Sequence, residues 1–589
     1  SAGDPGDGLC TPGECTLREA IALGNTLELV RIGFDIPGAL PHVIRPLTPL
    51  PVPGRPIHTI DGYTQPGSSR GGPVDDWATL DNLIGIELDG SALGVGSTGL
   101  NLIHGATVRG LAIHSWRGAG LRLTLRADGR PMVIAGNYIG TDASGQLARG
   151  NGVGIEVFPD ALVQGASLSW QIGNRTPGVF GSVLRADNCN LVSANLTSGI
   201  RVVGGVATDT DAGLLTCNRI GLARDGTPLG NGGHGLEILA PTSASAHGLV
   251  AIFNLIGSNA LDGIAIRSLQ PGTAGVGRIG LAFNEIGIAD GAPRHNGGHA
   301  VSIGSETLGV QAVEMIASTI DHANGAAVRI LGADTRASVW GSLPATSVPI
   351  DLGPAGVTPN DTGDPDTGPN ELLNAPELLS AEFNDAGNRV RVRYQLDTQG
   401  LRPRVVRFYA QIDGRLESLG EQRYPGGVAS VELSASRGFE RLAEGTEIVA
   451  QTLIPTALIA SEISATPVLL SSRQAVATAA PVREGGGARA RFTVSLEPAV
   501  TGNTALSYRT VDGSAIAGSD YQASSGTLTL TPGSPQATVD VPILNDSVIE
   551  ADESFTLEVW SETSFSIGTA QAAATIVDED RLRQDRGQY

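Results

Sequence analysis

The fold of this chain is decided by a short repeated unit that is clearest in residues 217–238, CNRIGLARDGTPLGNGGHGLEI. An asparagine with an apolar residue two positions later opens the unit, at residues 136–140, 189–193, 217–221, 253–257 and 283–287. A short segment of alternating apolar residues closes it, at residues 154–157, 199–202, 235–238, 263–266 and 300–303. Period-2 alternation between glycine-rich corners predicts strand, turn and strand in each unit.

The spacing of the units predicts a parallel β-helix. The opening asparagines recur at intervals of 53, 28, 36 and 30 residues, and they are Asn137, Asn190, Asn218, Asn254 and Asn284. The first interval is nearly double the others, and residues 170–173 (WQIG) are predicted to fill the missing step. Coils of about thirty residues suit rungs that stack about 4.8 Å apart. The asparagines would then form a structural ladder of amide hydrogen bonds rather than a catalytic group.

The composition limits the partners of the chain. Its 589 residues include 80 glycines and 34 prolines, and 60 acidic residues outnumber 39 basic ones to give a net charge of −21. No lysine is present, so every basic residue is arginine. This balance disfavours nucleic acid and anionic membranes, and it suits an extracellular protein or one that binds cations. The sequence contains no run of eighteen apolar residues and therefore predicts no membrane-spanning helix. We expect a secreted or cell-surface protein whose signal peptide has been removed before Ser1.

The four cysteines fall into two pairs. Cys10 and Cys15 flank a Pro-Gly turn, which favours a disulfide over metal binding by two cysteines alone, and therefore an oxidising compartment. Cys189 and Cys217 occupy the same slot in neighbouring coils, where either a disulfide or two buried thiols would fit.

The N-terminal region predicts a cap for the coils. Residues 16–19 form a capping box that opens a short helix over 16–23, with Leu17, Ala20 and Ile21 on one face. Such a helix would cover the apolar end of the coils and its unpaired strand groups.

Residues 15–21, CTLREAI, resemble the CSLREA motif that opens many exported bacterial right-handed β-helix proteins. Residues 36–38, 44–47, 60–67 and 86–90 are similar to the same family. The resemblance covers residues 1–372 and implies a right-handed parallel β-helix with a cap over 1–30. Most members are surface or secreted proteins of unknown activity, so the resemblance implies a fold and a location rather than a reaction.

The rest of the chain predicts two β-sandwich domains, at 373–472 and 473–580, before a tail at 581–589. Residues 354–370 are predicted to be a solvated polar linker, although the oxygen atoms of Asp361, Asp364 and Asp366 would also suit Ca²⁺. Strand-like segments between polar turns over 373–472 predict an Ig-like sandwich without a chemical motif.

The last domain resembles a Calx-beta module at residues 482–485, 508–515, 517–521, 545–555 and 576–580. The resemblance implies a Ca²⁺ site at one end of the sandwich, made by Glu484, Asp520, Asp546, Glu550, Glu553, Asp578 and Asp580. Carboxylates from distant segments converge readily only when a cation neutralises them. Asn545 departs from the strong binders, which often carry a second acidic residue there, and this lowers the charge of the site.

One outward-facing slot of the coils carries alternating charges, in the order Arg122, Glu156, Arg201, Glu237, Ala265 and Ser302. We interpret it as a ladder of ion pairs on a solvated face. The alternative is a groove for an oligosaccharide, in which Glu156, Arg201 and Glu237 would act with the nearby Asp187, Asp209 and Asp211.

Two functions follow from these patterns. The preferred one is a non-catalytic, exported surface or extracellular protein with a structural or adhesive role, which self-associates or binds a glycan and is stabilised by calcium. A fibre- or matrix-forming subunit is one form of it. The alternative is a polysaccharide lyase or glycoside hydrolase that works in a groove on the coils.

Overall fold

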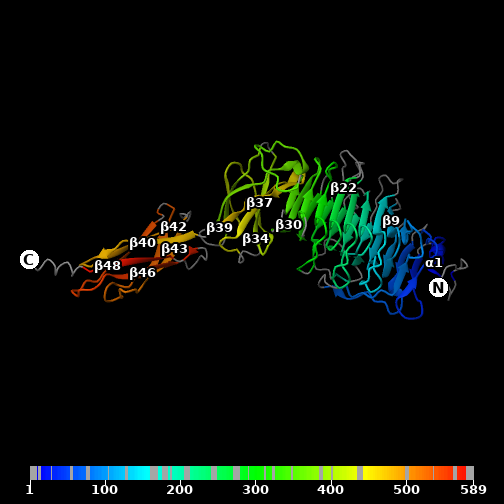
Figure 1. Ribbon diagram of the computed structural model, residues 1–589, viewed down its shortest axis with the longest axis horizontal. Coiled ribbons are helices and arrows are strands. Elements are labelled where there is room, and N and C mark those ends of the chain that lie inside the picture. The colour runs from blue at the N-terminus through cyan, green and yellow to red at the C-terminus, as the bar shows by residue number, and fades with distance from the viewer. Residues whose placement is uncertain are drawn as a thin grey trace, which may run out of the picture.

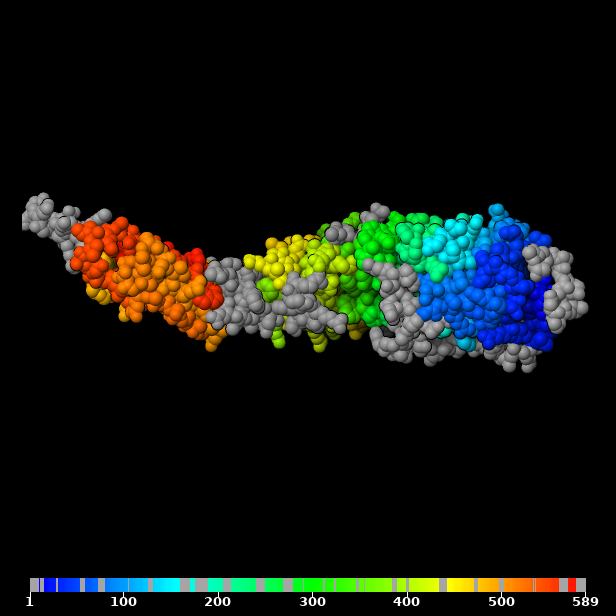
Figure 2. Space-filling view, turned by 90° about the horizontal axis from the view of Figure 1, so that it is seen from below, coloured from blue at the N-terminus to red at the C-terminus, as the bar shows by residue number. Residues whose placement is uncertain are grey.

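The protein is an elongated all-β molecule, in which the computed structural model places helix α1 (Leu17–Gly24) near one end and strand β48 (Ala570–Val577) near the other (Figure 1). Figure 2 shows the same succession of residues along the long axis after a quarter turn. The structure describes residues 10, 15–27, 30–52, 57–74, 80–103, 105–125, 131–159, 170–174, 184–185, 189–204, 213–240, 249–268, 279–289, 291–310, 313–321, 325–345, 349–353, 355–383, 389–398, 402–433, 442–471, 473–497, 503–532, 534, 536–560, 567–568 and 570–578. None of its described helices is long and apolar enough to cross a membrane.

The N-terminal part is built from three stacks of parallel strands. Stack one contains β1 (Val30–Gly33), β3 (Ile57–Asp61), β7 (Thr107–Arg109), β10 (Met132–Ala135), β13 (Trp170–Ile172), β17 (Gly213–Thr216), β20 (Leu249–Ile252), β23 (Ile279–Ala282), β28 (Val313–Ile320) and β30 (Ala337–Pro344). Stack two contains β2 (His42–Ile44), β5 (Ile86–Asp89), β8 (Leu111–His114), β11 (Tyr138–Ile139), β15 (Asn190–Val192), β18 (Asn218–Ile220), β21 (Leu255–Ile256) and β24 (Glu285–Ile286). Stack three contains β6 (Leu100–Leu102), β9 (Ala119–Leu125), β12 (Val153–Pro159), β16 (Ile200–Val203), β19 (Leu236–Ala240), β22 (Ile264–Ser268), β27 (Val301–Ile303), β29 (Val328–Ile330) and β31 (Ile350–Leu352).

From β7 to β27 the chain visits the three stacks in the same order, for example β17, β18 and β19 and then β20, β21 and β22. Leu215, Ile220 and Leu236 of one such coil are almost fully buried. Equivalent aliphatic side chains of successive coils therefore form one continuous core, which explains how a chain with 4% aromatic residues can fill its interior. The parallel pairing confirms the prediction of an all-β chain that is built from strand–turn–strand units.

The predicted asparagine ladder is confirmed. The side-chain amide of each asparagine donates to the side-chain oxygen of the next, at 3.2 Å from Asn137 to Asn190, 2.9 Å to Asn218, 2.9 Å to Asn254 and 3.0 Å to Asn284. A second ladder, which the sequence analysis missed, runs through Asn151, Asn195, Asn231, Asn259 and Asn296 with distances of 2.8–3.0 Å. Both ladders satisfy buried corners that alternate with the strands.

The interval of 53 residues between Asn137 and Asn190 does not contain a missing coil. Strand β13 pairs with β10 and β17 in stack one, while β15 pairs with β11 and β18 in stack two. The amide of Asn137 donates directly to Asn190. The prediction that residues 170–173 supply a separate step is therefore wrong, because β13 and β15 belong to one coil with a long connection between them.

The cap and the Cys10–Cys15 disulfide form as predicted, and the structure also bonds the second cysteine pair. Thr16 caps α1, its hydroxyl accepts from the amide of Glu19, and the Glu19 carboxylate accepts from the amide of Thr16 at 2.7 Å. Leu17 and Ile21 are buried against the first coils. Cys10 is bonded to Cys15, and Cys189 to Cys217, which decides between the two alternatives for the second pair.

The remaining strands form two regions that each pack two sheets around a core. The first region has β32 (Glu377–Phe383), β33 (Val390–Gln395), β36 (Ala429–Leu433) and β39 (Val468–Ser471), and β34 (Val405–Ile412), β35 (Arg415–Arg423), β37 (Glu447–Ile454) and β38 (Ile459–Ile463). The second region has a sheet of β40 (Arg473–Ala479), β42 (Arg489–Glu497), β45 (Gln536–Pro542) and β47 (Ile567–Gly568), and a sheet of β41 (Val482–Arg483), β43 (Thr504–Val511), β44 (Ser525–Leu530), β46 (Glu553–Trp560) and β48. Short elements complete the chain: η1 (Gly62–Thr64), η3 (Pro369–Leu372), η5 (Pro455–Ala457), β4 (Pro73–Val74), β14 (Leu184–Arg185), β25 (Ile288–Ala289) and β26 (Ala292–Pro293).

The segment predicted as a solvated linker is tied into the structure. Glu462 of β38 accepts hydrogen bonds from the amides of Leu352 and Thr358, both at 2.9 Å. Asn370 is fully buried, and its side chain bonds to Ala337 of β30 and Ala460 of β38. The prediction of a solvated linker is therefore wrong at its C-terminal end, residues 368–370, while residues such as Asn360 and Thr362 are exposed. Polar residues can be buried when groups of the protein take the place of water as their hydrogen-bond partners.

Candidate metal centres

The charged slot of the coils contains two ion pairs, each of which joins neighbouring coils. Arg122 contacts Glu156 at 2.7 Å, and Arg201 contacts Glu237 at 2.8 Å. The hydroxyl of Ser198 also donates to Glu237 at 2.6 Å. Burial raises the pKa of Glu237, but the hydrogen bonds from Ser198 and Arg201 outweigh it and hold the pKa below its ordinary value. Such a carboxylate is a poor proton donor at neutral pH, which is the opposite of what a glycosidase acid needs.

The other predicted catalytic acids, Asp187, Asp209 and Asp211, lie outside the residues that the structure describes. The catalytic interpretation of this face therefore stays a prediction for those three positions.

The C-terminal acidic residues converge at one end of the second two-sheet region. Asp520 lies in a turn after β43, Glu550 lies just before β46, and Glu553 begins that strand. One carboxylate oxygen from each of these three residues lies within 4.8 Å of the others. Glu484, which follows β41, and Asp578, which follows β48, line the same small cleft. The structure thus brings together five of the seven residues that the resemblance implied.

We call this group the terminal acidic cluster (Glu484, Asp520, Glu550, Glu553 and Asp578). Its negatively charged carboxylates repel one another. Burial and then the neighbouring Asp546, Asp578 and Glu550 raise the pKa of Glu484. Burial and then Asp520, Glu550 and Glu484 raise the pKa of Glu553. Each neighbour named here is another acid, and a divalent cation would relieve that repulsion.

Backbone groups hold parts of the terminal acidic cluster in place. The amide of Ile516 donates to Asp520 at 2.6 Å, and the amide of Glu550 donates to Asp578 at 3.0 Å. Asp546 places its own amide 3.0 Å from Glu484, while its carboxylate accepts from Val548 within the same turn. Asp546 therefore lies beside the cluster rather than among its three closest oxygens. Asp580 lies outside the described residues.

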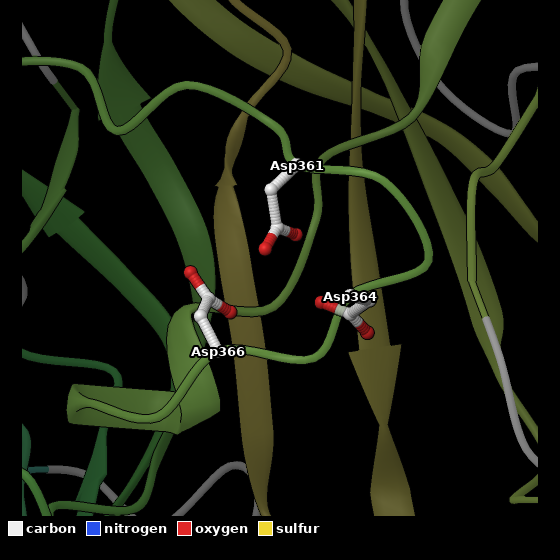
Figure 3. A group of neighbouring side chains, drawn as sticks. All are labelled: Asp361, Asp364 and Asp366. Atoms are coloured by element: carbon white, nitrogen blue, oxygen red, sulfur yellow. The ribbon is translucent and has the colours of Figure 1, made fainter.

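A second acidic group lies in the segment between β31 and β32. Asp361, Asp364 and Asp366 turn their carboxylates toward one another (Figure 3), and one oxygen from each lies within 4.8 Å of the others. We call it the junction acidic cluster. Asp364 accepts from the amide of Asn374 at 3.0 Å and lies 3.5 Å from the guanidinium of Arg404. Burial raises the pKa of Asp364 and, together with the charge of Asp361, that of Asp366.

The residues around the junction acidic cluster could not be found from the sequence. Asn374 and Arg404 lie in polar segments without a distinctive spacing, and both reach the cluster only because the chain folds back over it. The oxygen-rich composition of residues 359–370 was the one usable signal.

Comparison with known proteins assigns the C-terminal part of the chain. Residues 474–580 match the Calx-beta domain. The sodium/calcium exchanger 2 of Rattus norvegicus is 42% identical over 66 residues, which are 11% of this chain and 7% of the exchanger. The sodium/calcium exchanger 1 of Canis lupus familiaris is 41% identical over 56 residues, 10% of this chain and 6% of the exchanger. The chain thus spans less than a tenth of the length of these relatives.

Among solved structures, the apo form of the Calx CBD1 domain aligns with 19% of this chain and 100% of its own, at 23% identity and a TM-score of 0.17. All five residues of the terminal acidic cluster lie within the part of the chain that matches the Calx-beta domain.

Proposed function

We propose that this protein is a calcium-stabilised extracellular rod with a structural or surface role. In this proposal residues 1–372 form a right-handed parallel β-helix, residues 373–472 an Ig-like sandwich and residues 473–580 a Calx-beta sandwich. The two disulfides suit an oxidising environment, and the acidic charge suits a protein that meets calcium at extracellular concentration.

The observation that carries the proposal is the terminal acidic cluster within the Calx-beta match. Asp520, Glu550 and Glu553 would supply the closest oxygens for Ca²⁺, with Glu484, Asp578, Asp546 and Asp580 completing the proposed ligand set. Calcium accepts six to eight oxygens at irregular angles, so a group of carboxylates from separate loops suits it. The names of the relatives, sodium/calcium exchangers, are consistent with calcium as the ion.

The test compares two variants on the same strand by isothermal titration calorimetry of the full chain. Glu553→Gln removes a charge from the terminal acidic cluster, while Glu558→Gln removes the same charge from an exposed ion pair with Arg509, 2.7 Å away. We expect Glu553→Gln to weaken Ca²⁺ binding at least tenfold and Glu558→Gln to leave it unchanged. Equal effects of the two variants, or none, would contradict calcium binding at this end of the sandwich.

A rigid stack of coils with two appended sandwiches also suits self-association through exposed strand edges or adhesion to a glycan. Electron microscopy with and without Ca²⁺ tests the assembly. A monomer under both conditions would exclude the filament form of the proposal and leave the calcium site intact.

A further inference from the structure

The junction acidic cluster holds carboxylate oxygens that are buried without a hydrogen-bond partner. Oδ1 of Asp361 and Oδ1 of Asp366 each expose less than 1 Å² and accept no hydrogen bond. Figure 3 shows that the side chains point into the space that they share with Asp364. A buried, ionised oxygen without a partner costs free energy, so a cluster that holds two of them needs a compensating positive charge.

Arg404 does not provide that charge for the two unpartnered oxygens. Its guanidinium lies 3.5 Å from Asp364, and its contact is with Oδ2 of that residue. The Asp364 side chain is itself only 7% exposed, and its Oδ1 already accepts from Asn374. One cation close to all three carboxylates would neutralise the oxygens that the arginine leaves alone.

The loop holds the three carboxylates together before any ion is added. The Asn374 side chain holds the backbone of Asp361 through two hydrogen bonds. Its Oδ1 accepts from the amide of Asp361 at 3.0 Å, and its Nδ2 donates to the Asp361 carbonyl at 2.8 Å. Asn360 closes the loop through two hydrogen bonds with Ala375, at 2.8 and 2.9 Å. A site that is already closed spends little conformational entropy when it binds an ion.

The loop lies where the coils meet the first two-sheet region. Strand β30 of stack one pairs antiparallel with β35, with Leu343 opposite Leu416, and the core of the coils continues into Tyr409, Leu416, Val449 and Ile463. Glu462 and Asn370 fasten the two ends of the acidic loop to strands on both sides of this junction. An ion in the loop would therefore stabilise the contact between two structural regions.

We propose that Asp361, Asp364 and Asp366 bind one Ca²⁺ that locks the end of the coils to the first two-sheet region. The donors are all carboxylate oxygens, which select a hard cation over zinc or copper. Calcium suits them better than magnesium, because magnesium demands regular octahedral geometry at short distances and gives up its water reluctantly. The ion is separate from the one proposed for the terminal acidic cluster, and neither site depends on the other.

The test uses the full chain and three single variants. Asp366→Asn removes a proposed ligand, and Asp397→Asn is the matched control, because Asp397 is exposed and its carbonyl accepts from the same Asn374. Glu553→Gln reports on the terminal acidic cluster alone. Calcium titration by calorimetry gives the number of ions, and differential scanning calorimetry gives the shift in Tm that calcium causes.

We expect Asp366→Asn to lose the junction Ca²⁺ and the calcium-induced rise in Tm of the transition in which the coils unfold. Asp397→Asn and Glu553→Gln should keep the junction ion and this rise in Tm, while Glu553→Gln weakens only the separate ion of the terminal acidic cluster. Without calcium, Asp366→Asn should melt no lower than the unchanged chain, because it removes a repelling charge. If that variant does not fold, Asp361→Asn takes its place. The proposal is overturned if the ligand variant binds as many ions as the unchanged chain, or if Glu553→Gln alone abolishes all calcium binding.

Discussion

Substituting Asn218 by alanine tests whether the asparagine ladder stabilises the coils. The Asn218 amide donates to Asn254 at 2.9 Å and to the carbonyl of Ile172 at 2.9 Å, and its side-chain oxygen accepts from Asn190 at 2.9 Å. Alanine removes these three bonds, and a longer one of 3.3 Å to the carbonyl of Thr216, from a buried corner. At a net contribution of about 1 kcal/mol for each bond, we expect the free energy of unfolding of the coils to fall by about 3–4 kcal/mol.

The loss is limited to about that amount because the neighbours keep other partners. Asn190 still donates to the carbonyl of Ile134 at 2.8 Å, and the side-chain oxygen of Asn254 still accepts from the backbone amide of residue 218 at 3.1 Å. The carbonyls of Ile172 and Thr216 are the groups that lose a side-chain donor. The variant therefore weakens one rung without leaving several buried groups unsatisfied.

Urea unfolding followed by circular dichroism measures the effect, and Arg201→Ala on the outer face is the control. Arg201 also makes a side-chain contact between coils, with Glu237 at 2.8 Å, but it is partly exposed to solvent. Glu237 keeps its hydrogen bond from Ser198 in this variant, and a partly exposed ion pair contributes about 1 kcal/mol, so the control should cost about 1 kcal/mol. Equal costs for the two variants would refute the reasoning, because the buried ladder would then be worth no more than a solvated contact.

Three further predictions concern charge. Because burial and neighbouring acids raise the pKa of Glu484 and Glu553, these two groups bind more protons in the folded chain than in the unfolded one. Their contribution to the Tm without calcium should therefore rise as the pH falls from 7 toward the ordinary glutamate value of 4.5. Scanning calorimetry of the unchanged chain against Glu553→Gln measures this contribution, and calcium should remove it. Glu237→Gln should leave reducing-end release from polysaccharides at the level of the unchanged chain, and a loss of turnover in this variant would restore the catalytic interpretation. Burial raises the pKa of Asp61, but the hydrogen bonds that Arg109 and then Arg31 donate to it outweigh burial and lower the pKa below its ordinary value of 3.8. Asp61 therefore stabilises the coils fully above that pH, and this stabilisation is lost as the pH falls through the lowered pKa. Asp61→Asn should cost about 3 kcal/mol in urea unfolding at pH 7 and flatten the acid limb of stability.

The sequence predicted the repeated rungs well because their physical signal is local. Alternating aliphatic residues and a recurring asparagine define each coil, and the cap follows from the reciprocal contacts of Thr16 and Glu19. The second ladder was missed because its members look like ordinary turn residues. Asn151 and Asn231 precede glycine, as turn asparagines often do, while Asn195 precedes leucine, so no common pattern marks them.

Spacing alone could not place residues 170–173, because a solenoid accepts long surface connections at little cost in free energy. The candidate metal centres show the same limit. The resemblance to the Calx-beta family indicated which segments carry the acidic residues, but the geometry of the turn decides that the Asp546 carboxylate accepts from Val548 within its own turn. At the junction, composition suggested oxygen donors. The loop that carries them is held by strands distant in the chain, through contacts such as Asn370 with Ala460, which no local pattern predicts.

Because the chain has no lysine, arginine is the main side chain that can pair with its acidic residues, and these residues fall into two groups. Where an arginine reaches a carboxylate, as at Glu237 and Asp61, the pKa falls and the pair needs no ion. Where the nearest charges are other acids, as at Glu553 and Asp366, the pKa rises and a cation is the remaining way to neutralise the group at neutral pH. Calcium should therefore act on the end of the coils and on the Calx-beta region, while the arginine-paired face should respond to salt and not to chelators. A chelator should therefore lower the Tm of the Calx-beta region by the same amount whether or not the ion pair of Arg201 with Glu237 is present. If Arg201→Ala changed the effect of the chelator on that Tm, this division would be contradicted.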